Sequence, residues 1–304
     1  MNLCAELVRL GVRRFIKRRG RHQTIEEARQ RMRAAAAWVP HAPKGTETVA
    51  VDAGGVPADR IGTRASQPDR NVLYLHGGGY VAGSPSLYRH FTWRIATVTR
   101  ANVLAIDYRL APEHPVPAAL DDAVAAYRWL LVNGADPRRT MVIGDSAGGG
   151  LAFATLLKLR DDGLPLPAAA AALSPWTDLA LTGPSLNLNA GADPMVNVED
   201  ARLFAAQYLA GTDPRNPYAS PLYGDPAGLP PTLIHVGSDE VLHDDAVRMA
   251  DRLRAAGRHV ELEIWPRMPH VWHLFAPVLP EARQAIARIG AFAQRWFDKG
   301  GRNL

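Results

Sequence analysis

The segment Gly-Asp-Ser-Ala-Gly at residues 144–148 places one serine among small residues. An apolar run precedes it, and an Ala/Leu-rich run with helical period follows it. Gly-x-Ser-x-Gly between a strand and a helix is typical of a nucleophile elbow, whose strained backbone exposes the serine hydroxyl. Glycine is needed on both sides because a Cβ there would collide with the sharp turn. A plain tight turn is the alternative, but the context favours Ser146 as a nucleophile.

A serine hydroxyl is a weak nucleophile at neutral pH, so it needs a general base that is itself oriented by an acid. In this architecture the three residues follow in the chain order Ser, Asp/Glu, His. Asp239 comes directly after the apolar run 232–237 and is expected at the same end of the sheet as the serine. Asp239 is therefore the predicted acid. Asp244 and Asp245 are alternatives, although they would fall inside the next helix.

The base is expected in the segment "PRMPHVWH", residues 266–273, which follows the apolar run 260–265. His270 is nearer to the end of that run and lies in the loop, so it is predicted as the base in preference to His273. The His-x-x-His spacing could also suggest a metal site, but no third ligand accompanies the pair. We therefore expect neither a metal nor an organic cofactor.

The segment "HGGGYV", residues 76–81, follows another apolar run. Glycine amides can approach a substrate oxygen without obstruction by side chains, so Gly77, Gly78 and Gly79 are candidate oxyanion donors. The amide of Ala147, at the expected helix N-terminus, is a further candidate because negative charge is favoured there. A glycine-rich turn can also bind phosphate, but neither Gly-x-Gly-x-x-Gly nor Gly-Lys-Ser/Thr is present. An oxyanion hole is the preferred interpretation.

Short apolar runs alternate with longer helical patterns through most of the chain, which predicts an α/β fold with helices on both faces of a mostly parallel sheet. The expected parallel strands are 71–76, 103–107, 140–145, 169–174, 232–237 and 260–265, and the expected helices are 86–101, 117–133, 147–162, 241–257 and 281–298. Two short runs around a Gly-Gly within 47–65 predict an antiparallel hairpin at the sheet edge, for about eight strands in all.

Two regions break this alternation. Residues 1–42 precede the first strand, and residues 176–222 are rich in turn signals with one helical pattern near 199–210. Both are interpreted as additions to a catalytic domain formed by residues 43–175 and 223–304.

The formal net charge of the 304 residues is +5, but it is unevenly distributed. Residues 1–33 hold ten Lys/Arg against three Glu, a charge of +7, so the remainder carries −2. A nearly neutral body does not favour binding of nucleic acid. The single cysteine, Cys4, excludes an internal disulfide framework and a thiolate zinc site, and it suits a cytoplasmic location.

The basic N-terminal segment lacks the uninterrupted apolar region of a secretory signal, because arginines interrupt it every few positions. Val8, Val12, Phe15 and Ile16 recur at helical spacing and predict an amphipathic helix docked on its own protein. Attachment to an anionic membrane surface and binding of nucleic acid are the less favoured alternatives. No run reaches about 18 apolar residues, so no membrane span is expected.

From about Asn71 onward the sequence resembles the hormone-sensitive-lipase-like esterases, bacterial family IV of the α/β-hydrolase fold. The blocks that carry the resemblance occur in the family's order: "HGGGYVAGS", "DYRLAPEHPVPAALDD", "GDSAGGGLA", "SPL" at 220–222, "GSDEVLHDD" and "MPH" around His270. The form "GDSAG" resembles one branch of that family.

The resemblance implies a carboxylic ester hydrolase without a cofactor. It implies that Ser146 is the nucleophile, Asp239 the acid and His270 the base, with Gly78, Gly79, Ala147 and also Gly77 as candidate oxyanion donors. His76 would brace the glycine loop, and Glu113 with the prolines of "APEHPVP" would support it. The triad histidine is followed by Val-Trp where Gly-Phe is common, which bears on pocket shape.

Residues 1–42 and 176–222 correspond in that family to a mobile cap that covers the acyl pocket. The resemblance therefore implies small ester substrates with short to medium acyl chains. A homodimer is common among similar proteins, although the sequence itself does not determine the oligomeric state. Plant hormone receptors of this fold lack the catalytic histidine, so the presence of His270 favours turnover over simple ligand binding. Amide hydrolysis and acyl transfer with the same triad stay open.

Overall fold

An eight-stranded sheet forms the centre of the protein in the computed structural model, which describes residues 3–15, 24–36 and 41–300. In spatial order the strands are β1 (Thr46–Asp52), β2 (Pro57–Thr63), β4 (Asn102–Ile106), β3 (Asn71–Leu75), β5 (Thr140–Asp145), β6 (Ala169–Leu173), β7 (Thr232–Gly237) and β8 (Val260–Trp265). β1 and β2 form an antiparallel hairpin at one edge, and β2 also pairs antiparallel with β4. The strands from β4 to β8 are mutually parallel, which confirms the predicted sheet.

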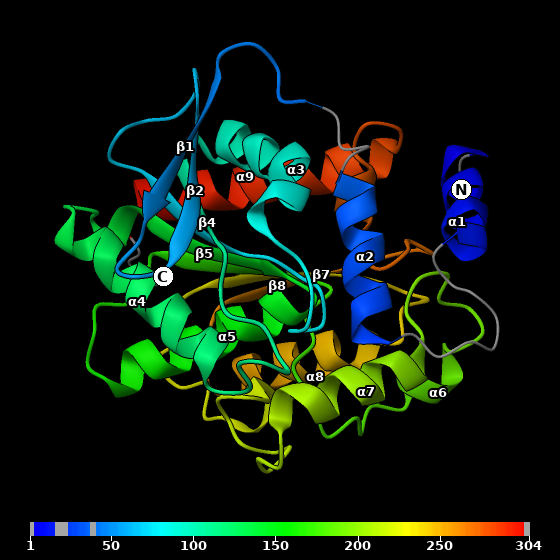
Figure 1. Ribbon diagram of the computed structural model, residues 1–304. Coiled ribbons are helices and arrows are strands. Elements are labelled where there is room, and N and C mark those ends of the chain that lie inside the picture. The colour runs from blue at the N-terminus through cyan, green and yellow to red at the C-terminus, as the bar shows by residue number, and fades with distance from the viewer. Residues whose placement is uncertain (1–2, 16–23, 37–40, 301–304) are drawn as a thin grey trace.

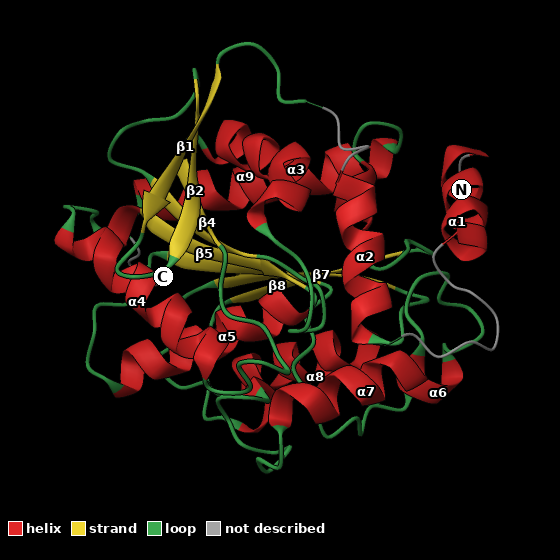
Figure 2. Ribbon diagram, viewed as in Figure 1, coloured by secondary structure: helices red, strands yellow, loops and turns green. Residues whose placement is uncertain are grey.

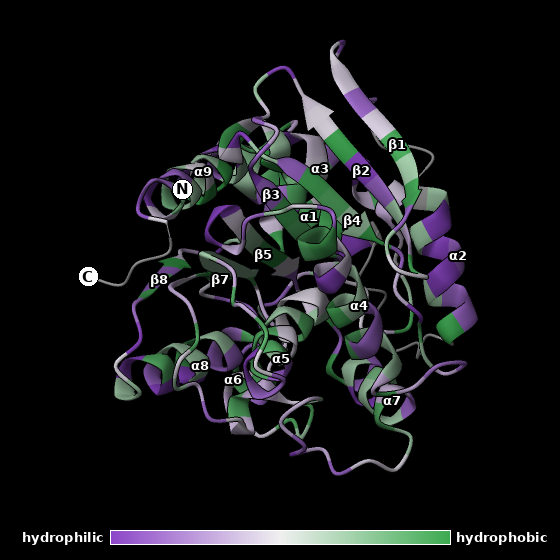
Figure 3. Ribbon diagram, turned by 90° about the vertical axis from the view of Figure 1, so that its left-hand side faces the viewer, coloured by the Kyte–Doolittle hydropathy of each residue, from purple (hydrophilic) through white to green (hydrophobic). Residues whose placement is uncertain are grey.

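Helices cover both faces of this sheet (Figures 1 and 2). One face carries α3 (Pro85–Thr99) and α9 (Pro280–Asp298), and the other carries α4 (Ala118–Val132), α5 (Ala147–Asp161) and α8 (His243–Ala255). A separate cluster of buried apolar side chains fills each interface. Strands β3, β5, β6 and β7 are buried along their whole length, because a parallel sheet is covered on both sides. Figure 3 shows β4 and β5 as largely hydrophobic.

Four further α-helices in the described part of the chain lie outside these layers. They are α1 (Leu3–Phe15), α2 (Ile25–Ala36), α6 (Ser185–Leu188) and α7 (Val198–Leu209). Figure 1 shows α1 and α2 toward the right of the view, apart from one another, and α7 below α2. The sequence predicted α7 but not the single turn of α6, which is too short to give a helical period.

Helix α1 packs on its own protein, as the spacing of its valines predicted. Val12 is buried, Val8 is half-buried, and Ile16 lies outside the described residues. The buried face differs from the expectation in one respect: it also contains Arg9, which is only 9% exposed. A charged side chain in this position needs partners, because burial of an unpaired charge is strongly unfavourable.

Four loops meet at the carboxyl edge of the parallel strands. They follow β3, β5, β7 and β8, and they contain the glycine segment, Ser146, the acidic segment and His270 in that order. Ligand sites of open α/β sheets form at this edge because all parallel strands end there.

A pair of buried histidines attaches the last of these loops to the sheet. His273 lies in the short helix η3 (Trp272–Phe275), and its Nε2 is 3.0 Å from Nδ1 of His235 on β7. The two rings are nearly parallel, with 5.3 Å between their centroids. Burial lowers the pKa of both side chains, so both are neutral in the folded protein near pH 7.

We expect this pair to make the protein sensitive to acid. Both folded-state pKa values lie below the ordinary value of about 6.5, so below that pH the unfolded chain binds more protons than the folded one. The contribution of this pair to stability should therefore be constant above about pH 7 and fall as the pH drops below about 6.5. Urea unfolding followed by circular dichroism between pH 5 and 7.5 measures this slope.

The variant His273→Gln should show a shallower decline than the wild type, whereas replacement of the exposed His114 by Gln should leave the slope unchanged. Equal slopes in His273→Gln and the wild type would contradict the assignment.

Candidate active site

Ser146 lies at the turn between β5 and α5 with φ 53° and ψ −123°, a conformation rare for any residue other than glycine. A Cβ on Gly144 would lie 2.0 Å from the carbonyl oxygen of Gly148, and one on Gly148 would lie 2.1 Å from that of Leu75. Both positions therefore exclude any side chain. The turn has the geometry of the elbow that the sequence predicted.

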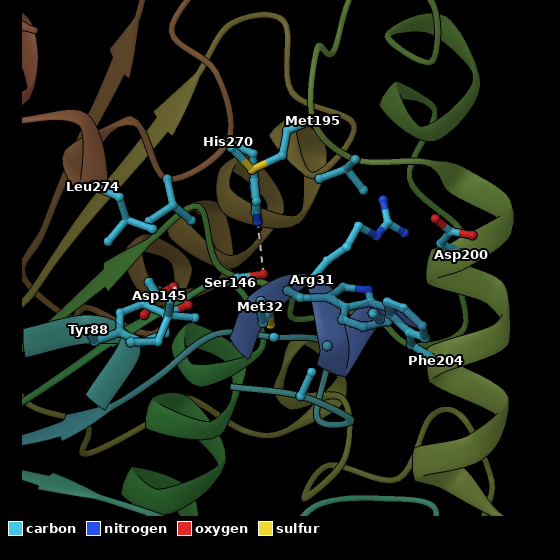
Figure 4. Close-up of a pocket in the computed structure, with 18 of the residues that line it drawn as sticks. Arg31, Met32, Tyr88, Asp145, Ser146, Met195, Asp200, Phe204, His270 and Leu274 are labelled. Carbon is cyan, nitrogen blue, oxygen red and sulfur yellow. Dashed lines mark hydrogen bonds between the residues drawn. The ribbon is translucent and has the colours of Figure 1, made fainter. Parts of the chain in front are cut away.

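His270 contacts this serine directly. Its Nε2 is 2.8 Å from Oγ of Ser146, and its side chain is buried in the loop after β8 (Figure 4). This distance suits proton transfer from the hydroxyl to the imidazole. The other candidate, His273, contacts His235 instead. Of the two histidines, the structure thus brings His270 to the serine.

The acid beside His270 is Glu240, and the prediction of Asp239 is wrong in this respect. Oε2 of Glu240 is 2.7 Å from Nδ1 of His270. Asp239 instead forms an ion pair with Arg9, with 3.0 Å between Nη2 and Oδ2, and accepts a hydrogen bond from Ser238. Adjacent residues of the turn after β7 point in different directions, and only the second points to the imidazole.

The alternatives Asp244 and Asp245 also contact other groups. Asp244 accepts a hydrogen bond from the amide of Ser185, and Asp245 accepts hydrogen bonds from the amides of Thr177 and Asp178. Both anchor the segment after β6 to α8 and are not directed at His270.

The carboxylate of Glu240 is fully buried, so it needs several donors. In addition to His270, its Oε1 accepts hydrogen bonds from the amide of Gly237 at 2.6 Å and from the hydroxyl of Ser174 at 2.8 Å. Ser174 in turn accepts the amide of Val271 at 3.1 Å. These bonds compensate the desolvation of the charge and join the acid to the histidine loop.

The environment of His270 acts on its pKa in two directions. Burial lowers the pKa, but the hydrogen bond to Glu240 and the charge of that carboxylate raise it, and the net result lies above the ordinary histidine value. The more distant carboxylates of Asp193 and Asp145 add to this effect. The site therefore favours the imidazolium that would form when His270 takes a proton.

The glycine loop supplies fewer free amides than the sequence suggested. The amide of Gly77 donates to Oδ1 of Asp145 at 3.0 Å, so this residue is unavailable as an oxyanion donor and its assignment is corrected. Gly78 and Gly79 have φ values of 127° and 65°, which only glycine adopts easily, and both line the pocket. Among the described residues, no group accepts a hydrogen bond from the amides of Gly78, Gly79 or Ala147.

Asp145 holds the glycine loop against the elbow, a role that the sequence did not reveal. Besides the amide of Gly77, its carboxylate accepts hydrogen bonds from the hydroxyls of Tyr74 and Tyr88. Burial raises its pKa to about 6 in spite of these bonds. A Cβ at position 77 would lie 2.4 Å from Oδ2, so glycine is required there for close approach.

His76 braces the other side of the loop. Its Nδ1 is 2.8 Å from the carbonyl oxygen of Gly77, and its ring stacks on Tyr108 with 4.2 Å between centroids. Burial lowers the pKa of His76 to about 4, so the ring is neutral. Its contacts are those of a supporting residue.

Ser146 opens into a cavity of about 650 Å³ with mostly apolar walls. Figure 4 shows Tyr88 and Leu274 on one side of the serine and Arg31 and Phe204 on the other. The walls come from α2, α3, α7, the segment between β6 and α7, and the loop with η3. They include Ala28, Met32, Leu87, Trp176, Met195, Ala201 and Phe275. Polar reacting groups in a mostly apolar cavity are typical of sites for small organic molecules.

Neither a metal site nor a membrane-spanning helix is found in residues 3–15, 24–36 and 41–300. They contain no group of three or more His, Cys, Asp or Glu placed to bind a metal ion. They also contain no helix with the length and apolarity needed to span a membrane.

A profile of the α/β-hydrolase fold family matches residues 72–274. The chain belongs to this family. Among its relatives, the acetyl-hydrolase of Streptomyces hygroscopicus is 54% identical over 236 residues, which cover 78% of this chain and 79% of that protein. The esterase of Acinetobacter venetianus is 36% identical over 240 residues, 79% of each chain.

Solved structures agree with these relatives. An esterase from the bacterial hormone-sensitive lipase family superposes with a TM-score of 0.93 at 45% identity, over 98% of this chain and 99% of that one. The chain is therefore a carboxylesterase similar to hormone-sensitive lipase, as the sequence blocks indicated.

Substitution of Glu240 and of Asp239, one at a time, should show which carboxylate acts with His270 in this carboxylesterase. Glu240→Gln keeps the shape but favours the wrong histidine tautomer, a change that costs about 10⁴ in kcat in the serine-protease template. Asp239→Asn removes no contact to the imidazole and should cost less than about tenfold. The measurement is kcat with a p-nitrophenyl ester at pH 8. A larger loss of kcat in Asp239→Asn than in Glu240→Gln would contradict the assignment of Glu240.

Proposed function

We propose that this carboxylesterase acts through a covalent acyl-enzyme on Ser146. His270 takes the serine proton at Nε2 while Oγ attacks the ester carbonyl carbon, and Glu240 keeps Nδ1 protonated and the ring oriented. The negative oxygen of the tetrahedral intermediate accepts hydrogen bonds from the amides of Gly78, Gly79 and Ala147. The observation that carries the proposal is the continuous chain of contacts from Ser146 through His270 to Glu240.

Collapse of the intermediate breaks the bond to the alcohol oxygen. The alcohol leaves with the proton held by His270, and the acyl group stays on Ser146. Water then enters, gives a proton to His270 and attacks the acyl carbon, and the acid leaves as the proton returns to the serine oxygen.

We further propose that residues 1–42 and 176–222 form a cap over a catalytic domain of residues 43–175 and 223–304, and that the substrates are esters with short to medium acyl chains. α2 and α7 line the pocket, which supports a roof that limits chain length. The relative named acetyl-hydrolase supports small acyl groups. Cytoplasmic location and a homodimer stay predictions.

A receptor that binds without turnover has no use for the contact between Ser146 and His270. Amide hydrolysis and acyl transfer would use the same residues, and only kinetics distinguishes them from ester hydrolysis.

A panel of p-nitrophenyl esters from acetate to palmitate tests the proposal, with p-nitroanilides of the same acids as amide counterparts. The expected optimum lies at short to medium chains, with esters much faster than anilides. Ser146→Ala should remain folded and lose turnover by about 10⁶-fold. Near-wild-type hydrolysis by Ser146→Ala would refute the nucleophile, and faster hydrolysis of anilides would favour an amidase.

The pH dependence of kcat/KM should report His270. The base must be neutral, so activity should fall as the pH drops through its pKa, which Glu240 raises above the ordinary value of 6.5. Glu240→Gln removes that negative charge, so the acid limb of the residual activity should move to lower pH. An unchanged limb would mean that another group limits the rate. Asp145, with a pKa of about 6, would be the first to test by Asp145→Asn.

A further inference from the structure

We propose that Arg9 of α1 is a positioning residue for the catalytic acid and base. Its guanidinium joins the loops before His270 and Glu240 to the segment of residues 190–197, so docking of the N-terminal helix helps to hold the triad in its reactive geometry. This inference rests on the proposed roles of Glu240 and His270.

Three acceptors surround the guanidinium of Arg9. Its Nη1 donates to the carbonyl oxygen of Arg267 at 2.6 Å, and its Nη2 donates to that of Ala192 at 3.2 Å. The same Nη2 lies 3.0 Å from Oδ2 of Asp239. The Arg9 side chain is only 11% exposed, so these contacts are shielded from solvent. One residue thus binds three segments that are far apart in the sequence.

Each acceptor is linked to the catalytic acid or base, two by their place in the sequence and the third through a hydrogen bond. Asp239 directly precedes Glu240, and Arg267 lies three residues before His270. Ala192 precedes Asp193, whose carboxylate accepts the amide of Val241 at 3.0 Å. Val241 directly follows Glu240, so the acid is restrained on both sides, by Asp239 before it and Val241 after it.

The acid and base loops are also connected to one another beneath α1. The hydroxyl of Ser238 accepts the amide of Arg267 at 2.9 Å and donates to Asp239. The side chain of Arg267 reaches back to Glu6 of α1 at 3.2 Å. A change in the docking of α1 therefore acts on both loops at once.

An apolar residue would satisfy the packing needs of this helix face, where Ala5 and Val12 are buried. Burial of a guanidinium there carries a desolvation cost, which its three acceptors must offset. Such a group contributes geometry more than net stability. In the proposed function, the geometry it sets is that of Glu240 and His270.

The test compares Arg9→Met with Arg13→Met, which removes an exposed arginine from the same helix. Arg9→Met should lower kcat by about ten- to hundredfold, with a smaller change in KM, because small misplacements of catalytic groups have effects of this size. The acid limb of its pH profile should also move to lower pH, because a looser contact with Glu240 raises the pKa of His270 less. Arg13→Met should retain the wild-type kcat and pH profile.

Asp239→Asn weakens only one of the three contacts, so its loss should be about three- to tenfold. The double variant should be no slower than Arg9→Met alone, since both changes act on the same contact. Arg9→Lys, which can reach fewer acceptors, should give an intermediate kcat.

A purely structural role would lower the melting temperature of Arg9→Met but leave kcat and the pH profile of the folded enzyme at wild-type values, and that result would overturn the inference. If Arg9→Met does not fold, Arg9→Lys and Asp239→Asn provide the same comparison. Failure of the proposed function is distinguishable, because it would appear as residual turnover in Ser146→Ala.

Discussion

The contact between Ser146 and His270 requires a loop to cross the sheet edge. The serine follows β5 and the histidine follows β8, with β6 and β7 between them. Neighbouring strands are about 4.8 Å apart, so the histidine loop must reach back over the ends of two strands. The loop contacts the ends of both strands. At β7, the carbonyl oxygen of Met268 packs so closely on Gly237 that it would lie 2.1 Å from a Cβ there. At β6, the amide of Val271 donates a hydrogen bond to the hydroxyl of Ser174. The unusual backbone of Ser174, with φ 48°, belongs to this crossing.

Two buried carboxylates then determine the electrostatics of the site. Glu240 and Asp145 each accept hydrogen bonds from three donors and lie on different loops. Glu240 orients the imidazole, and Asp145 positions the glycine loop while its charge also acts on His270. In a medium of low dielectric constant such networks are strong when every partner is present and costly when one is missing. The precise geometry of the site thus depends on complete pairing of buried charges.

The segments outside the sheet complete the pocket and are tied to the same loops. Phe204 of α7 packs so closely on the glycine loop that a Cβ on Gly79 would lie 2.6 Å from its ring. Arg29 of α2 donates to the carbonyl oxygens of Val81 and Ala111 and pairs with Glu113, whose pKa falls to about 2 through this hydrogen bond. The glycine loop and the triad loops are therefore each contacted by an arginine from an N-terminal helix.

The amino-acid sequence alone determined the strands, the main helices, the hairpin, the elbow serine and its glycines, because hydrophobic period and turn chemistry are local properties. Tertiary structure decided which of two adjacent carboxylates faces the imidazole. Asp239 forms an ion pair with Arg9, which is 230 positions away in the chain. Glu240 accepts hydrogen bonds from Ser174 and Gly237. Similarly, the sequence does not distinguish Gly77 from Gly78 and Gly79 as an oxyanion donor. In the folded protein, the amide of Gly77 donates to Asp145 instead. The orientation of a loop residue depends on partners that only the folded chain brings near, so no local pattern could reveal it.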